Sequence, residues 1–147
     1  VDSKAKDTLS KYKGASIALP NMDEARMMTK LDDFEDEDVA KFLLKTMNLE
    51  AAAVTLGPRG ILLAVPDASP QIFAPLDNNI DNEVIDVTGA GDTVAATVAA
   101  GLTLNLSYPQ MMRLANVAAG IKVKKRGVDV ATTQEIIEAI GSHHIEI

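Results

Sequence analysis

The chain has 147 residues, of which 47% are hydrophobic and 24% are charged, and it contains no cysteine. This composition fits a globular protein and excludes disulfides, thiolate metal sites and cysteine nucleophiles. A net charge of -7 and only two tyrosines and three phenylalanines as aromatic residues disfavour a nucleic-acid partner. No apolar run reaches the roughly 20 residues that a membrane helix needs, and the N-terminus lacks the apolar core of a signal peptide. We therefore expect no membrane partner and a cytoplasmic location.

The first part of the chain is predicted to alternate between helix and strand. We expect a helix over 6–12, a short buried strand over 16–19 that stops at Pro20, a helix that begins at Asn21, and a longer helix over 35–47. In the longer helix, helical spacing places four apolar side chains on one face: Val39, Phe42, Leu43 and Met47.

The middle of the chain is predicted to form strands and the last third helices. Apolar runs at 52–56 and 61–65 flank a Gly-Pro-Arg-Gly turn and favour a hairpin, with weaker strands over 72–74 and 84–86. Helices are expected over 93–106, from a capping box at Ser107 to about residue 124, and from a cap at 132–135 to Gly141. This order predicts an α/β fold with a sheet covered on its faces. We find no linker or repeat, so 1–147 is interpreted as one unit.

The segment Asp86-Val87-Thr88-Gly89-Ala90-Gly91-Asp92 carries the sharpest chemical signal. It joins a short strand to a helix of small residues, and the N–H groups in the first turn of a helix form a natural anion site. Gly89 and Gly91 would let phosphate oxygens approach the backbone without a Cβ in the way. Asp92 would repel a phosphate, but it suits a site that also takes a proton from a hydroxyl attacking that phosphate. A glycine turn with an acidic first helical turn explains the same residues structurally, and both interpretations stay open.

Two other glycine-rich nucleotide motifs are excluded by spacing. A P-loop requires G-x-x-x-x-G-K-[ST], and the chain contains no such string. A dinucleotide fingerprint would require a third glycine where Val94 stands and an acidic residue about 20 positions further on, where 110–112 are Gln-Met-Met.

Three further groups of residues have a structural interpretation beside a functional one. Asn21 and Glu24 could orient a hydrated Mg²⁺, but Asn followed three residues later by Glu is also a helix-capping pair, which the residues alone favour. Thr55-Leu56-Gly57-Pro58-Arg59-Gly60 is explained by a hairpin turn. The acidic run over 32–38 is predicted to be a solvated helix start, and most of the cations at 122–126 are predicted to lie at a solvated helix end.

The pattern D-x-T-G-A-G-D at 86–92 resembles the C-terminal signature of the ribokinase-like (PfkB) carbohydrate kinases. Three other segments resemble motifs of that family in the same order: Asn21-x-x-Glu24, Thr55-x-Gly57-x-x-Gly60 and the late helix at 115–120. Within the family, the chain resembles the heptose-phosphate kinase domain of ADP-heptose synthesis proteins, on residues that include Val1-Asp2-x-Lys4, Tyr12-x-Gly14-Ala15 and Val123-x-Lys125-x-Gly127.

The resemblance implies transfer of a phosphoryl group from ATP, with Mg²⁺, to a hydroxyl of a small-molecule sugar or sugar phosphate. It implies that Asp92 is the general base and that the N–H groups of Gly89, Ala90 and Gly91 stabilise the transferred group. It also implies that the nucleotide is lined by Thr55, Gly57, Gly60 and Asn116. Lys4 would contact a phosphate, and Asn21 and Glu24 would hold a metal–water network.

The length of the chain is about half of what the resemblance implies for such a kinase domain. We therefore expect 1–147 to be the nucleotide-binding, catalytic C-terminal portion of a ribokinase-like three-layer α/β/α sandwich, without the N-terminal half that binds most of the sugar. The expected partner is that complementing half or a second copy of the chain, because missing strands leave a sheet edge unpaired. Two alternatives are a non-catalytic nucleotide-binding or interaction module and a structural remnant that dimerises.

Overall fold

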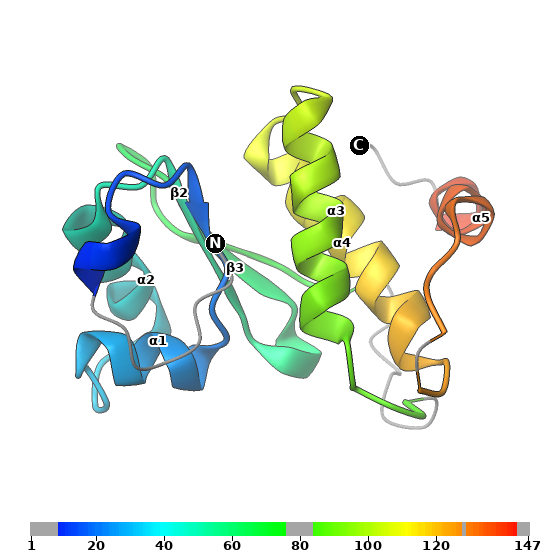
Figure 1. Cartoon of the computed structure of the whole chain (residues 1–147), viewed down its shortest axis with the longest axis horizontal. Helices are drawn as coiled ribbons and strands as arrows, with labels where there is room; N and C mark the ends of the chain where they lie inside the picture. Colours follow the sequence, from blue (N-terminus) through cyan, green and yellow to red (C-terminus); the bar gives the residue numbers. More distant parts are fainter. Residues whose placement is uncertain (1–8, 76–83, 128, 144–147) are drawn as a thin grey trace. The chain divides into compact units, whose positions relative to one another are not determined.

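The computed structural model describes residues 9–75, 84–127 and 129–143 (Figure 1). Its contacts divide the chain into two compact units, Val1–Phe73 and Ala74–Ile147, called here the N-terminal and the C-terminal unit. Each unit is described by itself.

The described residues of the N-terminal unit form a four-stranded mixed sheet with two α-helices. The strands are β1 (Ile17–Ala18), β2 (Ala51–Thr55), β3 (Ile61–Ala64) and β4 (Gln71–Phe73), in the order β1-β2-β3-β4. β1 pairs with β2 in parallel, and the other two pairs are antiparallel. The predicted hairpin is confirmed, with Ala53 opposite Leu63 and Thr55 opposite Ile61 across β2 and β3.

Helices α1 (Met22–Thr29) and α2 (Asp36–Met47) pack on the same side of this sheet (Figure 1). Both were predicted from the sequence, and Val39, Leu43 and Met47 of α2 are fully buried against β2 and β3. The prediction was wrong for Phe42, which is 40% exposed. The buried residues follow one another at four-residue steps, and Phe42 lies at the edge of that stripe, where it is only half covered.

The described part of the predicted helix over 6–12 is a 3₁₀ helix, η1 (Leu9–Tyr12), rather than an α-helix. Gly14 lies two residues after its end. Its positive φ of 81° turns the chain, and its N–H donates to the carbonyl of Met47 at 2.8 Å. A second 3₁₀ helix, η2 (Gly57–Arg59), forms the loop of the β2–β3 hairpin.

The described residues of the C-terminal unit form three helices, α3 (Ala90–Thr103), α4 (Tyr108–Val123) and α5 (Thr133–His143). α3 and α4 form a helical hairpin (Figure 1), and the predicted capping box between Ser107 and Gln110 starts α4. Gly101 lies where α3 approaches Met111, because a Cβ at Gly101 would be only 2.7 Å from Met111 Cγ.

Two predictions for this unit were wrong. Residues 84–86 are not a strand, since the N–H groups of Ile85 and Asp86 both donate to the carbonyl of Val123 at the end of α4, at 2.8 and 3.1 Å. Helix α3 begins at Ala90, three residues before the predicted start, because Gly89 takes a left-handed conformation that begins the helix directly.

Candidate functional site

The turn before α3 presents unused backbone donors. Gly89 is the N-cap of α3, with φ 78°, and it has no side chain that could cap the helix. The N–H of Ala90 donates to the carbonyl of Val87 at 3.2 Å, whereas the N–H groups of Gly91 and Asp92 have no backbone acceptor in the described part of the chain. The Asp92 side chain is exposed in the first turn. The turn therefore combines free N–H groups at a positive helix end with one exposed carboxylate.

Asp86 holds this turn in place. Its Oδ1 accepts from the N–H of Thr88 and its Oδ2 from the N–H of Gly127, both at 2.9 Å. The Thr88 backbone and side chain, followed by the Gly127 N–H, lower the pKa of Asp86 to about 2. Because both of its oxygens are occupied, Asp92 is the carboxylate of this segment that remains available for chemistry. Sequence reasoning assigned no role to Asp86, although Asp two residues before Thr is a frequent local turn pattern.

Two cations at the end of α4 differ from the predicted solvated helix end. Lys122 is buried, and its Nζ donates to the carbonyl of Gly127 at 3.1 Å. Lys125 donates to the carbonyl of Val130 and forms an ion pair with Glu135, both at 2.7 Å. The hydrogen bond from Lys125 and those from Thr132 lower the pKa of Glu135 to about 2.

Asn116, expected on the nucleotide side, is 7% exposed within α4. Its Nδ2 donates to the carbonyl of Ala74, at the long distance of 3.4 Å. The structure therefore gives Asn116 a link to the segment that follows β4, a partner that is 42 residues away and invisible in a sequence pattern.

Asn21 and Glu24 form the complete capping box that the residues alone favoured. Asn21 Oδ1 accepts from the Glu24 N–H at 2.8 Å, and Glu24 Oε2 accepts from the Asn21 N–H at 2.9 Å. Each oxygen has a further lone pair, and oxygen ligands of this kind suit a Mg²⁺ that keeps several waters. The donor set thus fits a water-mediated metal site. In the described part of the chain, no three His, Cys, Asp or Glu side chains gather into a direct metal site.

Thr55 lies beside this cap, at the carboxyl ends of the parallel strands β1 and β2. Its N–H donates to the carbonyl of Pro20 at 2.9 Å, and it pairs with Asn21 in a parallel bridge. Parallel strands in α/β proteins bind ligands at this end. The structure therefore brings together the predicted metal residues and the first predicted nucleotide residue.

The turn after Thr55 depends on two glycines. Gly57 has φ 59° and Gly60 has φ 94° with ψ -136°, conformations that strongly favour glycine. The N–H of Leu56 donates to the carbonyl of Gly60 at 2.8 Å, which closes the turn. A Cβ at Gly57 would meet nothing within 4 Å, so the backbone there borders open space. Lys4, the last predicted site residue, lies outside the described residues.

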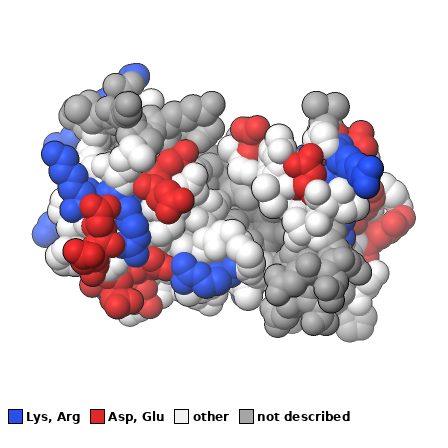
Figure 2. All heavy atoms as spheres, turned by 90° about the horizontal axis from the view of Figure 1, so that it is seen from below, with Lys and Arg blue, Asp and Glu red and all other residues white. Residues whose placement is uncertain are grey.

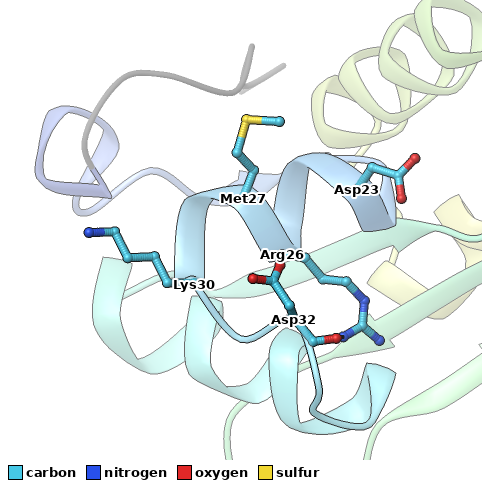
Figure 3. A pocket seen from close by; sticks show the side chains of 5 residues that line it. All are labelled: Asp23, Arg26, Met27, Lys30 and Asp32. Atoms are coloured by element: carbon cyan, nitrogen blue, oxygen red, sulfur yellow. Dashed lines mark hydrogen bonds between the residues drawn. The ribbon is translucent and has the colours of Figure 1, made fainter.

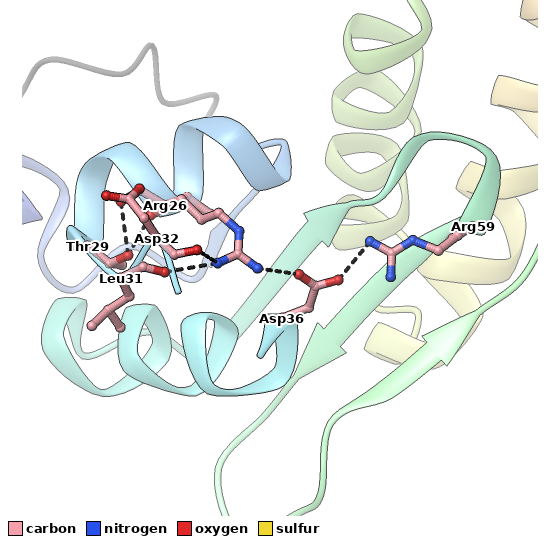
Figure 4. A network of polar contacts seen from close by, with 7 residues as sticks. Arg26, Thr29, Leu31, Asp32, Asp36 and Arg59 are labelled. Carbon is pink, nitrogen blue, oxygen red and sulfur yellow. Dashed lines mark hydrogen bonds and ion pairs between the residues drawn. The ribbon is translucent and has the colours of Figure 1, made fainter. Parts of the chain in front are cut away.

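An ion-pair network ties this turn to α2 (Figure 4). The two oxygens of Asp36 bind Arg26 at 2.8 Å and Arg59 at 2.7 Å, and Arg26 also donates to the carbonyls of Leu31 and Asp32. Burial pushes the pKa of Asp36 upward, but the hydrogen bonds and charges of Arg59 and Arg26 outweigh it and hold the pKa below its usual value. The prediction of a solvated helix start was therefore wrong for Asp36, whose side chain is 20% exposed.

A hollow of about 350 Å³ lies along α1 (Figure 3), lined by Asp23, Arg26, Met27, Lys30 and Asp32. None of these residues was predicted to be in the site, and Arg26 is occupied by the network with Asp36. We assign no role to this hollow.

Charges of both signs lie next to one another on the face drawn in Figure 2, where the described residues form no continuous basic surface. In the parts of the chain that the structure describes, every helix is too short or too polar to span a bilayer.

The sequence was compared with known families and with known proteins. The pfkB family of carbohydrate kinases matches residues 1–135. The chain belongs to this family. Bifunctional protein HldE of Shewanella amazonensis is 38% identical over 148 residues, which cover 99% of this chain and 30% of that protein. The chain therefore spans about a third of the length of the curated relatives that it matches.

Solved structures identify the fold. Ribokinase of Arabidopsis thaliana, solved with ribose and ATP, aligns with a TM-score of 0.75 and 23% identity over 90% of this chain and 42% of that chain. Phosphofructokinase-2 of Escherichia coli aligns with a TM-score of 0.78 and 17% identity over 93% of this chain and 43% of that chain. The predicted family and the predicted ribokinase-like α/β class are both confirmed.

Proposed function

We propose that the chain is the nucleotide-binding, catalytic portion of a carbohydrate kinase that phosphorylates a hydroxyl of a sugar or sugar phosphate. Membership of the pfkB family supports this activity. The resemblance of the sequence motifs to those of heptose-phosphate kinase domains supports a heptose phosphate as the acceptor. The complementing partner would be the sugar-binding half of such a domain or a second copy of the chain. We place the reaction in the cytoplasm, where ATP is present.

The observation that carries the proposal is the turn at 89–92. The free N–H groups of Gly91 and Asp92 and the positive end of α3 offer an anion site that needs no basic side chain. Gly89 supplies the left-handed conformation that exposes this turn, and Ala90 would add its N–H after release from Val87. Donors fixed in this way stabilise the charge that spreads over a phosphoryl group during transfer.

Asp92 is proposed as the general base. Its carboxylate is exposed beside the free N–H groups, and no hydrogen bond with another described residue occupies it in the structure. The carboxylate would accept the proton of the attacking sugar hydroxyl and hold that hydroxyl in line with the phosphoryl group.

We propose that Thr55, Gly57 and Gly60 line the nucleotide and that Asn21 and Glu24 bind the waters of Mg²⁺. When bound, Mg²⁺ would neutralise charge on the phosphates of ATP. Asn116 and Lys4 are proposed as further nucleotide and phosphate contacts.

The test is phosphoryl transfer by the chain alone and in the presence of the separately expressed upstream part of the Shewanella amazonensis relative. ADP release would be followed with ribose, fructose 6-phosphate or a heptose phosphate as the acceptor. Asp92→Asn should abolish sugar-dependent ADP release while leaving ATP binding intact, whereas Asp129→Asn, a second exposed acid of the same unit, should not change the rate. Full activity of Asp92→Asn would refute the base assignment. ATP binding without turnover on any acceptor would favour the non-catalytic module.

A further inference from the structure

Among the described residues of the C-terminal unit, Lys122 is the buried cation. It lies in the last turn of α4 and is 3% exposed, although a charged lysine normally keeps its head group in water. Burying a charge costs free energy unless hydrogen bonds and opposite charges compensate it. The surroundings of Lys122 supply both kinds of compensation.

The ammonium group belongs to a chain of hydrogen bonds that links the segment after α4 to the segment before α3. Lys122 Nζ donates to the carbonyl of Gly127 at 3.1 Å, and the N–H of Gly127 donates to Asp86 Oδ2 at 2.9 Å. The charge of Lys122 also helps to lower the pKa of Asp86. The segment that leads into the Gly89 turn is therefore joined to the end of α4 through Asp86, Gly127 and Lys122.

The stem of Lys122 also contacts the turn directly. A Cβ placed on Gly89 would lie 3.4 Å from Lys122 Cε, so the lysine stem packs against the residue that begins α3. This contact brings a buried positive charge close to the positive end of a helix, which is an unfavourable pairing by itself. The carboxylate of Asp86 balances part of that charge, and a bound anion would balance the rest.

From this geometry we propose that Lys122 is a positioning residue of the anion-binding turn, whose fixed positive charge holds the Gly89 turn in the conformation that accepts a phosphate. The proposal rests on the proposed function for the identity of the anion. Its structural part, the link from Lys122 through Gly127 and Asp86 to the turn, does not depend on that function. Lys122 acts through the turn and does not itself contact the reacting atoms.

The test compares three variants of the full chain. Lys122→Met keeps most of the stem and removes the charge, Lys122→Arg keeps the charge, and Lys124→Met removes a charge from an exposed position on the same helix end. The carboxyl pKa of Asp86 and the backbone amide signals of Gly89 and Gly91 would be followed by NMR. Binding of Mg-ATP, inorganic tripolyphosphate and adenosine would be measured by calorimetry.

In Lys122→Met, the pKa of Asp86 should rise above its value of about 2 and the Gly89 and Gly91 amide signals should move. Affinity for Mg-ATP and tripolyphosphate should fall about tenfold, which corresponds to about 1.4 kcal/mol, while affinity for adenosine should not change. Lys122→Arg should restore both readouts, and Lys124→Met should resemble the wild type. If Lys122 acts through packing alone, Lys122→Met, which keeps most of the stem, should bind Mg-ATP and tripolyphosphate as tightly as the wild type.

Failure of the two proposals can be distinguished. If the wild-type chain binds neither ATP nor tripolyphosphate, the proposed function fails, while the pKa of Asp86 and the amide signals still test the role of Lys122. If Lys122→Met does not fold, the wild type provides the test, because the buried ammonium should give slowly exchanging proton signals with contacts to the Gly89 α-protons. Absence of these contacts, or amide signals of Gly89 and Gly91 that do not move in a folded Lys122→Met protein, would overturn the inference.

Discussion

The carboxylate of Asp36 joins two arginines of different exposure, which allows the strength of each ion pair to be predicted (Figure 4). Arg26 is 22% exposed and also donates to two backbone carbonyls, so its guanidinium is already held in place. Arg59 is 60% exposed and extends from the η2 turn. Two double-mutant cycles, which combine Asp36→Asn with Arg26→Met or with Arg59→Met, separate the two pairs.

The coupling energy should be larger for the more buried pair. For Arg26 and Asp36 we expect about 1.5 kcal/mol, the lower end of the range for hydrogen bonds to charged groups. For Arg59 and Asp36 we expect about 0.5 kcal/mol, because solvent screens an exposed pair and an ordered long side chain loses entropy. Asn keeps the shape of the Asp36 side chain, so the cycles report mainly on its charge.

Acid should remove the stabilisation that the ionised carboxylate of Asp36 gives to the fold. The pKa of Asp36 is lower in the folded protein than its ordinary value of 3.8, so the carboxylate stabilises the fold above about pH 4. This stabilisation is lost as the pH falls through the lowered pKa. The difference in unfolding free energy between wild type and Asp36→Asn should therefore be full at pH 7 and shrink below pH 4.

Urea unfolding followed by circular dichroism at pH 7 and at pH 3 measures these differences. Asp38→Asn is the matched control, because Asp38 lies in the same helix turn with a side chain that is 56% exposed and 4.0 Å from Lys41. Its substitution should change stability by less than about 0.5 kcal/mol. A coupling for Arg59 as large as that for Arg26, or a difference that does not depend on pH, would refute the reasoning.

Two further predictions concern the α3–α4 hairpin, and both are measured by urea unfolding. Gly120→Ala should stabilise the protein by about 0.5–1 kcal/mol, because alanine is the better helix former and a Cβ at this position meets nothing within 4 Å. Gly101→Ala should destabilise it by about 1 kcal/mol, because the added Cβ would lie 2.7 Å from Met111 Cγ. Equal effects of the two substitutions would contradict the packing described. Ser107→Ala should cost about 1 kcal/mol by removing the capping box with Gln110, and a Ser107→Thr protein as unstable as Ser107→Ala would argue against the cap.

Local patterns carried most of the fold prediction. The apolar steps of α2, the glycine turn between β2 and β3 and the Ser107 cap are each defined by residues close together in the sequence. One error arose where a distant partner decides the outcome. Residues 84–86 have strand-like composition, but the carbonyl of Val123 at the end of α4 takes the N–H groups of Ile85 and Asp86.

The candidate site also combines features that local spacing predicts with contacts that it does not predict. The Asn21–Glu24 cap and the Gly89 turn follow from spacing, and the structure contains both. The partners that fix the η2 turn and the Gly89 turn could not be found from a pattern, because Arg59 meets Asp36 across 23 positions and Gly127 meets Asp86 across 41. A sequence shows the glycines that leave a backbone open, but only the folded chain shows which charges fix that backbone in place.

The measurement that tests the central claim most directly is a titration of the isotope-labelled chain with Mg-ATP, followed through its backbone amide signals. If the chain is the nucleotide-binding portion of a carbohydrate kinase, the signals of 55–60 and 89–92 should move together and saturate with one dissociation constant. Adenosine alone should move the first group and leave the second unchanged. Absence of saturable changes at 89–92, or changes confined to the hollow along α1, would contradict the account.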